Sequence, residues 1–558
     1  MDNHAIADNF SLLSRLMDIH GDNSFKAKSY SSAAFTIDKL STSLSALPAE
    51  KIFSIRGIGD AIGKRIVEQI ETGQLSILNE YLAKTPPGIL EMLGIKGIGP
   101  KKIATIWKEL EIESLGELLY ACNENRLTLY KGFGEKSQQN IKESIEFYLG
   151  TIGSYLYQQM ESYAYSLDAK LKGSFPQDQF MLSGEFRRQL EIINTLEWVT
   201  TLPANQLKDF FTANEFETIS IADGYISFKG KENVTLGFYC TDINHFFNQL
   251  FQTSCSEAFL SAWKEITLWD AEKACPSEAS IFELSDISQI PAFQREKASV
   301  IHLAKTGQLP KEIQPEDIKG IIHSHSNWSD GANTLEQMAT AAKARGLEYL
   351  VISDHSKSAF YANGLSEERI RAQHQQVDEL NTKLYPFKIF KSIESDILND
   401  GNLDYSNEVL AGFDLVIASV HANLKMSEEK AMMRLRKAIE NPFTAILGHM
   451  TGRLLLSRNG YPVNHKLIIE ACAANQVVIE LNAHPRRLDV DWRWIDYALE
   501  KKVLISIDPD AHSIDGFDDC RYGVLVAQKA GLTKEQNLSS FSLKAFEEFI
   551  MAQKAKRR

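Results

Sequence analysis

The chain has 558 residues, 44% of them hydrophobic and 24% charged, with a formal net charge of −13. This length predicts about three or four domains of a water-soluble globular protein, since one hydrophobic core rarely serves more than about 250–300 residues. The negative charge argues against wrapping of nucleic acid by bulk charge, and the lack of an apolar run of about 18–20 residues argues against a membrane span.

The cellular compartment is predicted from the N-terminus and the cysteines. The opening MDNHAIADNF has neither the basic nor the apolar segment that directs secretion. The six cysteines are scattered and form no CxxC pair. Reduced thiols are typical of the cytoplasm, so we expect a cytoplasmic protein that makes no membrane contact.

Three glycine-rich hairpins are predicted in the first 150 residues, each with a hydrophobic–Gly–x–Gly pattern followed at once by a helix. They are FSIRGIGDAIGKRIVEQI (53–70), LGIKGIGPKKIATIWKEL (93–110) and YKGFGEKSQQNIKESI (130–145). Glycines permit a tight turn with outward N–H groups, and the helix N-terminus that follows attracts phosphate without reading base sequence. The candidate DNA contacts are Gly57, Gly59, Lys64, Gly97, Gly99, Lys101, Lys102, Gly132, Gly134 and Lys136.

The run SFKAKSYSSAAFTIDKL (24–40) and the first hairpin together resemble the N-terminal domain of family X DNA polymerases, the group that includes polymerase beta. In some members this domain is also a deoxyribose-phosphate lyase, which uses a lysine on the helix after the first hairpin. Here Arg65 stands at that position with Lys64 beside it. Arginine stays protonated and adjacent helical residues do not share a face, so we do not expect lyase activity.

The stretch GEFRRQLEIINTLEWV (184–199) resembles the family X motif of Gly-Ser, paired Arg and Asp-x-Asp. Gly184, Arg187 and Arg188 match this motif. The resemblance implies that the two arginines contact phosphate, whereas the competing interpretation is a solvated pair at a strand end.

The polymerase carboxylates of that motif are missing. The serine position holds Glu185, the Asp-x-Asp positions hold Thr195 and Glu197, and the third aspartate position falls at Thr235. Nucleotidyl transfer needs converging carboxylates that hold two Mg²⁺ ions, and Glu197 alone cannot hold both. We therefore expect a palm that keeps its fold but not polymerisation, unless a nearby carboxylate such as Glu191 compensates.

Strands and helices are predicted to alternate from about residue 320 onward. The apolar, β-branched runs are GIIHSH (320–325), YLVISDH (349–355), FKIFKSIESDI (387–397), LVIASVH (415–421), AILGH (445–449), VVIELNA (477–483) and VLISIDPDAH (503–512). Helical patterns lie between them, which predicts parallel strands joined by crossover helices. About seven such units suggest a closed or nearly closed barrel related to the (β/α)8 type.

Nearly every predicted strand ends in a potential metal ligand. Strand ends of such a barrel converge on one face, and strand residues two apart point to the same side, so the H-S-H and D-A-H spacings can direct two side chains to one ion. Imidazoles mixed with carboxylates suit Zn²⁺, Mn²⁺ or Fe²⁺ better than Mg²⁺ alone. The candidate ligands are His323, His325, Asp330, His355, Glu394, His421, His449, Asp510 and His512.

The motifs HSH with SDG, ISDHS, IESDIL, ASVH, GHMTGR and DPDAHS resemble those of a PHP (polymerase and histidinol phosphatase) domain over residues 316–555. All nine family ligand positions carry suitable residues, and Met450 departs from the usual proline. The resemblance implies three divalent metal ions, Mn²⁺ or Zn²⁺ with Fe²⁺ as an alternative. One would be bound by His323, His325, Glu394 and Asp510, the second by Glu394, His421 and His449, and the third by Asp330, His355 and His512.

The same resemblance implies phosphoester hydrolysis, in which the cations lower the pKa of a bridging water that attacks phosphorus. Glu394, His323 and Asp510 are the candidate catalytic residues. Arg453 and Arg487 are candidate phosphate contacts.

The motifs in chain order resemble a bacterial family X DNA polymerase with a C-terminal PHP domain. The expected domains are helical 1–85, fingers-like 86–150, a degenerate palm and thumb in 151–290, a linker in 291–318 and the PHP domain in 319–558. The expected function is metal-dependent 3′→5′ exonuclease action in DNA repair by a monomer that binds 3′ ends, gaps or single strands. The alternatives are a bifunctional polymerase and exonuclease, a phosphomonoesterase of the histidinol-phosphatase type, and a noncatalytic scaffold.

Overall fold

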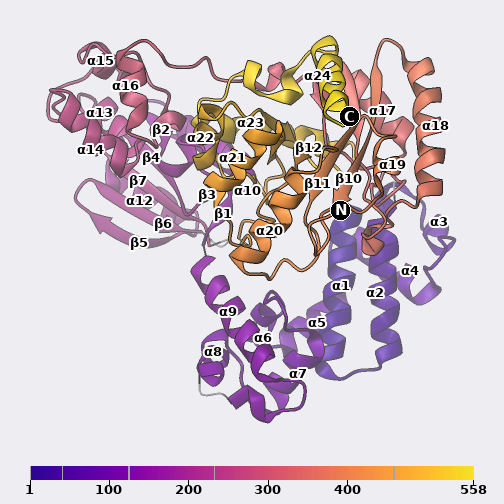
Figure 1. The fold of residues 1–558 in the computed structure, drawn as a ribbon. Coiled ribbons are helices and arrows are strands. Elements are labelled where there is room, and N and C mark those ends of the chain that lie inside the picture. Colours follow the sequence, from indigo (N-terminus) through magenta and orange to yellow (C-terminus); the bar gives the residue numbers. More distant parts are fainter. Residues whose placement is uncertain are drawn as a thin grey trace. The chain divides into compact units, whose positions relative to one another are not determined.

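The computed structural model describes residues 2–40, 42–123, 126–151, 153–230, 233–456 and 459–557. The chain forms two compact units, Met1–Ile152 and Gly153–Arg558, each described by itself below (Figure 1). No helix in these described ranges has the length and apolar character needed to cross a membrane.

The first unit is built from helices around one core of aliphatic side chains. Its α-helices are α1 (Asn3–His20), α2 (Ser24–Asp38), α3 (Ala49–Phe53), α4 (Asp60–Thr72), α5 (Ser76–Lys84), α6 (Pro87–Met92), α7 (Pro100–Lys108), α8 (Leu115–Asn123) and α9 (Glu135–Thr151). The helices α4, α7 and α9 follow the three glycine-rich hairpins, as the sequence pattern predicts.

The three hairpins share one backbone geometry. Gly57, Gly97 and Gly132 have φ angles of 93°, 88° and 94°, a left-handed conformation that only glycine adopts without strain. The hydrophobic residue after each of these glycines is buried, while Gly59 and Gly99 each cap the N-terminus of the next helix. Each hairpin therefore presents the N-terminal backbone of its helix to solvent.

The second unit opens with α10 (Tyr157–Ser174) and a five-stranded sheet in the order β2-β4-β7-β6-β5. The strands are β2 (Phe180–Ser183), β4 (Thr195–Thr200), β5 (Glu217–Ala222), β6 (Tyr225–Lys229) and β7 (Thr235–Cys240), with α11 (Gly184–Arg187) and α12 (Ala204–Ala213) between them. A two-stranded ladder pairs β1 (Tyr155–Leu156) with β3 (Ile192–Ile193). The central pair β4–β7 is parallel, and stacked aromatic rings such as Trp198 and Phe238 fill the core.

A helical subdomain follows this sheet. It comprises α13 (Phe246–Thr253), α14 (Glu257–Ile266), α15 (Glu278–Glu283) and α16 (Ser299–Lys305). Arg295 is 1% exposed in its core, where the guanidinium lies over the rings of Phe251 and Phe282. The first half of the segment 291–318, expected as a linker, is thus packed into this subdomain rather than connecting freely.

The remainder of the unit is a barrel of seven parallel strands in the order β14-β13-β12-β11-β10-β9-β8. They are β8 (Gly320–Ile321), β9 (Tyr349–Ile352), β10 (Lys388–Asp396), β11 (Leu415–Ser419), β12 (Thr444–Leu447), β13 (Val478–Asn482) and β14 (Ile505–Asp508). A parallel bridge between Ser324 and Ala511 joins the extensions of the first and last strands. The sheet is therefore nearly closed, and the expected barrel class is confirmed.

Helices connect the barrel strands and pack around them (Figure 1). They are α17 (Leu335–Ala344), α18 (Glu367–Leu384), α19 (Asn407–Leu410), α20 (Glu428–Ile439), α21 (His465–Asn475), α22 (Ile495–Glu500), α23 (Cys520–Lys529) and α24 (Leu543–Lys556). Phe546 of α24 stacks on Tyr349 and contacts Phe390 near the amino-terminal ends of β9 and β10. The loops at the carboxyl ends of the strands are thus left to form the site.

Candidate metal centre

Nine imidazole and carboxylate side chains converge at the carboxyl end of the barrel. They come from β10 and from the loops that follow β8, β9, β11, β12 and β14, so the six crossovers between β8 and β14 bring them together. All nine are the ligands that the sequence predicts. Eight of the nine form three overlapping groups, and the ninth, His449, lies against the carboxylate of Glu394, which is 1% exposed.

The first group comprises His323, His325, Glu394 and Asp510. The Nε2 atom of His323 lies 3.2 Å from Oε1 of Glu394 and 3.4 Å from Oδ1 of Asp510. The Nε2 atom of His325 lies 3.0 Å from the same Asp510 oxygen. These four residues are the set expected for one ion.

The second group surrounds the other side of Glu394. The Nε2 atoms of His421 and His449 lie 3.1 and 3.0 Å from its Oε1, and the Nδ1 of His355 lies 3.0 Å from its Oε2. The structure groups His355 and His421 with Glu394, and His449 of the expected set lies against the same carboxylate oxygen as His421.

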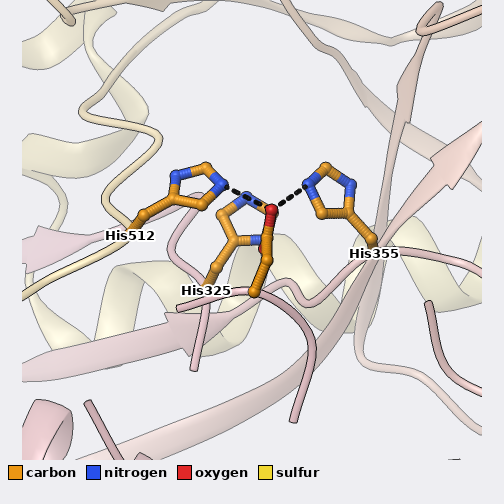
Figure 2. A group of neighbouring side chains, drawn as sticks. His325, His355 and His512 are labelled. Atoms are coloured by element: carbon orange, nitrogen blue, oxygen red, sulfur yellow. Dashed lines mark ion pairs between the residues drawn. The ribbon is translucent and has the colours of Figure 1, made fainter. Parts of the chain in front are cut away.

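The third group is the most open part of the cluster. The Nε2 atoms of His512 and His355 lie 3.4 and 3.7 Å from Oδ2 of Asp330, and His325 joins them (Figure 2). The side chains of His512 and Asp330 are 42% and 32% exposed, whereas His323 is fully buried. The cluster is therefore most accessible to solvent on the side of Asp330 and His512.

Two carboxylates that the sequence interpretation missed hold the histidines from behind. Glu480 of β13 lies 2.5 Å from the Nδ1 of His323, and Asp396 of β10 accepts a hydrogen bond from the Nδ1 of His421. Such contacts fix the tautomer and leave Nε2 for a metal. A signal existed for Asp396, which follows Glu394 by two residues and so shares its strand face.

The backbone is strained at two candidate ligands. His323 and Asp510 have φ angles of 60° and 52°, a left-handed region that costs non-glycine residues free energy. The bonds His325 N to Ala511 O and Ala511 N to His323 O hold both segments together. The barrel closure thus keeps the two side chains directed at Glu394.

The charges of the cluster favour proton sharing between imidazoles and carboxylates. Burial lowers the pKa of His421, but the attraction of Glu394 and the hydrogen bond to Asp396 outweigh it and raise the pKa to about 10. Burial likewise lowers the pKa of His512, but the hydrogen bond to Asp330 and the attraction of Asp510 raise it to about 9. The carboxylates around these two imidazoles therefore favour positive charge at this place.

The residues fit divalent metal ions. Within the described part of the chain, Nε2 of His323 and Oε2 of Glu394 are buried and make no hydrogen bond of good geometry. Buried polar atoms are normally satisfied, and a metal ion held by these side chains would satisfy them. Imidazole and carboxylate ligands without thiolates are compatible with several divalent metals.

Replacing Glu480 by glutamine is expected to weaken metal binding by roughly 10–100-fold, because the amide no longer fixes the His323 tautomer. Competition with a chelator measures the affinity. The matched control is Glu379→Gln, the same chemical change at an exposed carboxylate on α18. Equal metal affinity of the Glu480 variant and the unmodified protein would contradict this role.

The arginines proposed as phosphate contacts differ in what surrounds them. Arg453 donates to Asp491 at 2.7 Å and to the backbone of Arg487, so its guanidinium is occupied. Arg487 is half-buried at the edge of the cluster, with Nε 3.7 Å from Oδ2 of Asp510. Arg487 is therefore the better placed of the two for a phosphate at the metal site.

Arg187 and Arg188 both have carboxylate partners within the second unit. Arg187 makes two bonds of 2.8 Å to Glu278, and Arg188 lies 2.7 Å from Glu296. Lys529 of α23 donates to the Arg188 carbonyl, which attaches this loop to the barrel. A phosphate contact from either guanidinium would require the loss of an ion pair.

The positions matched to the polymerase carboxylates lie together on the parallel pair β4–β7. Thr195 is paired with Thr235, and Glu197 with Gly237. Burial raises the pKa of Glu197, which accepts a 2.9 Å hydrogen bond from Tyr239. All groups suited to a metal among the described residues lie in the barrel, and none includes Glu197.

Two other carboxylates near this position have different partners. Glu185 accepts bonds from the backbone and side chain of Asn194, at 2.6 and 2.9 Å. Glu191, considered as a compensating carboxylate, faces Arg493 of the barrel at 3.8 Å.

Most of the hairpin lysines lie on the surface of the first unit. Lys64, Lys101 and Lys136 are exposed, whereas Lys102 is half-buried and donates to Ser137 at 2.8 Å. Arg65, at the lyase lysine position, is paired with Glu68 at 2.6 Å.

Three family models match the chain. They are a helix-hairpin-helix domain over residues 1–75, a SAM-like helix-hairpin-helix tandem over residues 89–146 and a PHP domain over residues 322–484. The chain is 32% identical over 559 residues to the DNA polymerase/3′-5′ exonuclease PolX of Bacillus subtilis, covering 96% of each chain. It is also 29% identical over 170 residues to a probable phosphatase of Acetivibrio thermocellus, covering 29% of this chain and 64% of that protein.

Proposed function

Because the chain belongs to the bacterial family X DNA polymerases with a C-terminal PHP domain, we propose that it is a DNA-repair enzyme whose barrel hydrolyses phosphodiesters. The proposed action is metal-dependent and 3′→5′ exonucleolytic. The observation that carries the proposal is the convergence of nine ligand side chains around Glu394, with buried ligand atoms that lack hydrogen bonds. The proposed location is the cytoplasm, which the six free cysteines support.

The nine side chains would hold the ions, which supply charge neutralisation and an acidified water when bound. The chain's own groups orient the DNA and exclude bulk water. Arg487 would bind a phosphate oxygen beside Asp510. Asp330 and His512 line the open side through which the strand end would enter.

The proposal includes loss of polymerisation. Thr195 and Thr235 stand opposite one another where two further carboxylates would be needed, and Glu197 is buried and hydrogen-bonded to Tyr239. One such carboxylate cannot hold the two Mg²⁺ ions of nucleotidyl transfer. The hairpins and the family relationship indicate DNA binding, and we propose 3′ ends at gaps or single strands as the substrate of a monomer.

A second candidate is hydrolysis of a small phosphate monoester. It is favoured by relatives that match 29% and 39% of this chain and are named probable phosphatases. The two hairpin matches weigh against it, because hairpins of this kind bind the phosphate backbone of DNA and a small monoester has no such backbone.

A labelled primer–template with Mn²⁺ and deoxynucleotides is expected to be shortened from the 3′ end and not extended. The expectation rests on the ligand cluster in the barrel and on the threonines Thr195 and Thr235 at two positions where the palm would need carboxylates. Denaturing electrophoresis of the products measures both activities at once.

The control substrate is a free phosphomonoester without DNA. Template-directed extension would contradict the loss of polymerisation, and turnover of the monoester without loss of primer length would favour the second candidate. Release of nucleotides from the 5′ end would contradict the proposed polarity.

A further inference from the structure

Phe360 is an exposed aromatic side chain on a loop that follows a metal-ligand position. The loop, residues 356–364, comes directly after His355 and contains a short turn of 3₁₀ helix, Phe360–Ala362. Phe360 is 88% exposed, whereas Ala359 and Ala362 on either side of it are buried. The backbone therefore anchors the small residues and directs the large apolar one outward.

The loop is held firmly against the metal-ligand residues. Ser358 donates from its backbone to Asp404 and from its hydroxyl to Asp396, both at 2.6 Å. Asp396 in turn holds the Nδ1 of His421. The loop closes on itself, because Leu365 N bonds to His355 O at 2.9 Å.

The close packing of Gly364 completes this anchoring. A Cβ at Gly364 would lie 1.9 Å from the carbonyl oxygen of Ser356. The loop is thus built to hold one conformation, and its exposed ring is not a consequence of a loose chain.

The position of Phe360 distinguishes it from the other large exposed apolar side chains of the barrel. Among the described residues these are Tyr385, Met433, Leu467 and Met551. Met433, Leu467 and Met551 lie on helices, and Tyr385 precedes β10 and so belongs to the amino-terminal end. Phe360 alone lies on a loop at the carboxyl end, where the ligands converge.

Basic residues lie on three loops at the same end of the barrel. Lys357 belongs to the loop of Phe360, exposed Lys425 follows β11, and Arg486 and Arg487 follow β13. Loops after parallel strands all lie at the carboxyl end, so three of them carry positive charge beside the cluster. A rigid aromatic ring among cations is the combination that binds single-stranded nucleic acid, with bases on the ring and phosphates on the cations.

We propose that Phe360 forms a nucleobase subsite, on which a base of the unpaired 3′-terminal segment stacks while its phosphates follow the cationic loops to the metal cluster. This inference rests on the proposed exonuclease function and specifies its substrate as a strand whose terminal bases are unstacked. Base stacking on an aromatic side chain contributes about 1–3 kcal/mol per base, so loss of the ring should raise KM by roughly tenfold.

The test compares Phe360→Ala, Phe360→Trp and the matched control Tyr385→Ala, an equally exposed aromatic at the other end of the barrel. Full-length, metal-loaded protein cleaves two single-stranded oligonucleotides, one with normal bases and one with abasic sites at the three 3′-terminal positions. The expected result is a roughly tenfold rise in KM for Phe360→Ala on normal DNA, with kcat unchanged. On abasic DNA the KM of the unmodified protein should rise to the same value. On normal DNA, Phe360→Trp should have the low KM of the unmodified protein, and Tyr385→Ala should leave the KM unchanged.

A second readout separates the subsite from the hydrolytic function. A 2-aminopurine near the 3′ end should be quenched when the unmodified protein is mixed rapidly with the strand, and not with Phe360→Ala. The subsite would be overturned if Phe360→Ala raised the KM equally on normal and abasic DNA. It would also be overturned if the unmodified protein and Phe360→Ala quenched 2-aminopurine fluorescence equally. A fall in thermal stability of Phe360→Ala would also overturn it, because the ring would then pack within the chain. Quenching without any cleavage by the unmodified protein would refute the exonuclease and retain the subsite.

Discussion

Glu394→Gln is expected to reduce phosphodiester hydrolysis by about a thousandfold or more and to remove metal from at least two of the three ligand groups. The carboxylate has imidazole nitrogens of His323, His421 and His449 within 3.0–3.2 Å of one oxygen. Glutamine keeps the volume but presents one neutral oxygen and a nitrogen that donates hydrogen bonds. The substitution therefore changes charge and ligand type at the point shared by the groups.

Elemental analysis of the purified variant and cleavage of labelled single-stranded DNA measure the two effects. The same chemical change at Glu379, exposed on α18, serves as the control and should alter neither. Circular dichroism establishes that both variants are folded. A Glu394 variant that keeps its full metal content and its cleavage rate would exclude the cluster as the hydrolytic site.

Glu278→Ala is expected to destabilise the helical subdomain by roughly 3–5 kcal/mol. The carboxylate is bound by two arginines, Arg187 with two contacts of 2.8 Å and Arg295 with one of 2.7 Å. Arg295 is 1% exposed, so removal of Glu278 leaves a buried positive charge without its counterion. Hydrogen exchange of α13 and α14 measures the free energy of local unfolding.

The helical subdomain is expected to become less stable as the pH falls, because of the lowered pKa of Glu278. Burial raises the pKa of Glu278, but the hydrogen bond from Arg187 and the attraction of Arg295 outweigh it and lower the pKa from 4.5 to about 2. A lowered pKa stabilises the folded state above the unfolded pKa, and the contribution of roughly 3 kcal/mol is lost as the pH falls from 4.5 to about 2. This loss should be absent in Glu278→Ala.

Glu283→Ala, exposed on the same helix, is the matched control and should behave as the unmodified protein. If Glu278→Ala exchanges no faster than that control, the ion pairs contribute nothing to stability. A Glu278→Gln variant, which keeps most of the volume, should be destabilised less than Glu278→Ala.

The positions of the candidate ligands could be predicted from the sequence because two local rules apply. Residues two apart on a strand share a face, and parallel strands carry their carboxyl ends to one rim. These rules place His323 and His325 beside Asp510, almost 190 residues away, without any knowledge of contacts. The hairpin glycines were equally predictable, since a φ near 90° selects glycine through local sterics alone.

The contacts that the side chains make could be identified only from the tertiary structure. Arg187, Arg188 and Arg453 all read as phosphate contacts, yet each is paired with a carboxylate 38–108 residues away. Glu480 supports His323 across 157 residues, and no local pattern distinguishes it from any other strand glutamate. Local sterics and strand periodicity depend on residues that are close together in the sequence. The sequence alone therefore determined where the candidate ligands and the turns lie. Ion pairing depends on which surfaces the packed domains bring together, so only the fold decided which charges have internal partners and which remain available at the cluster.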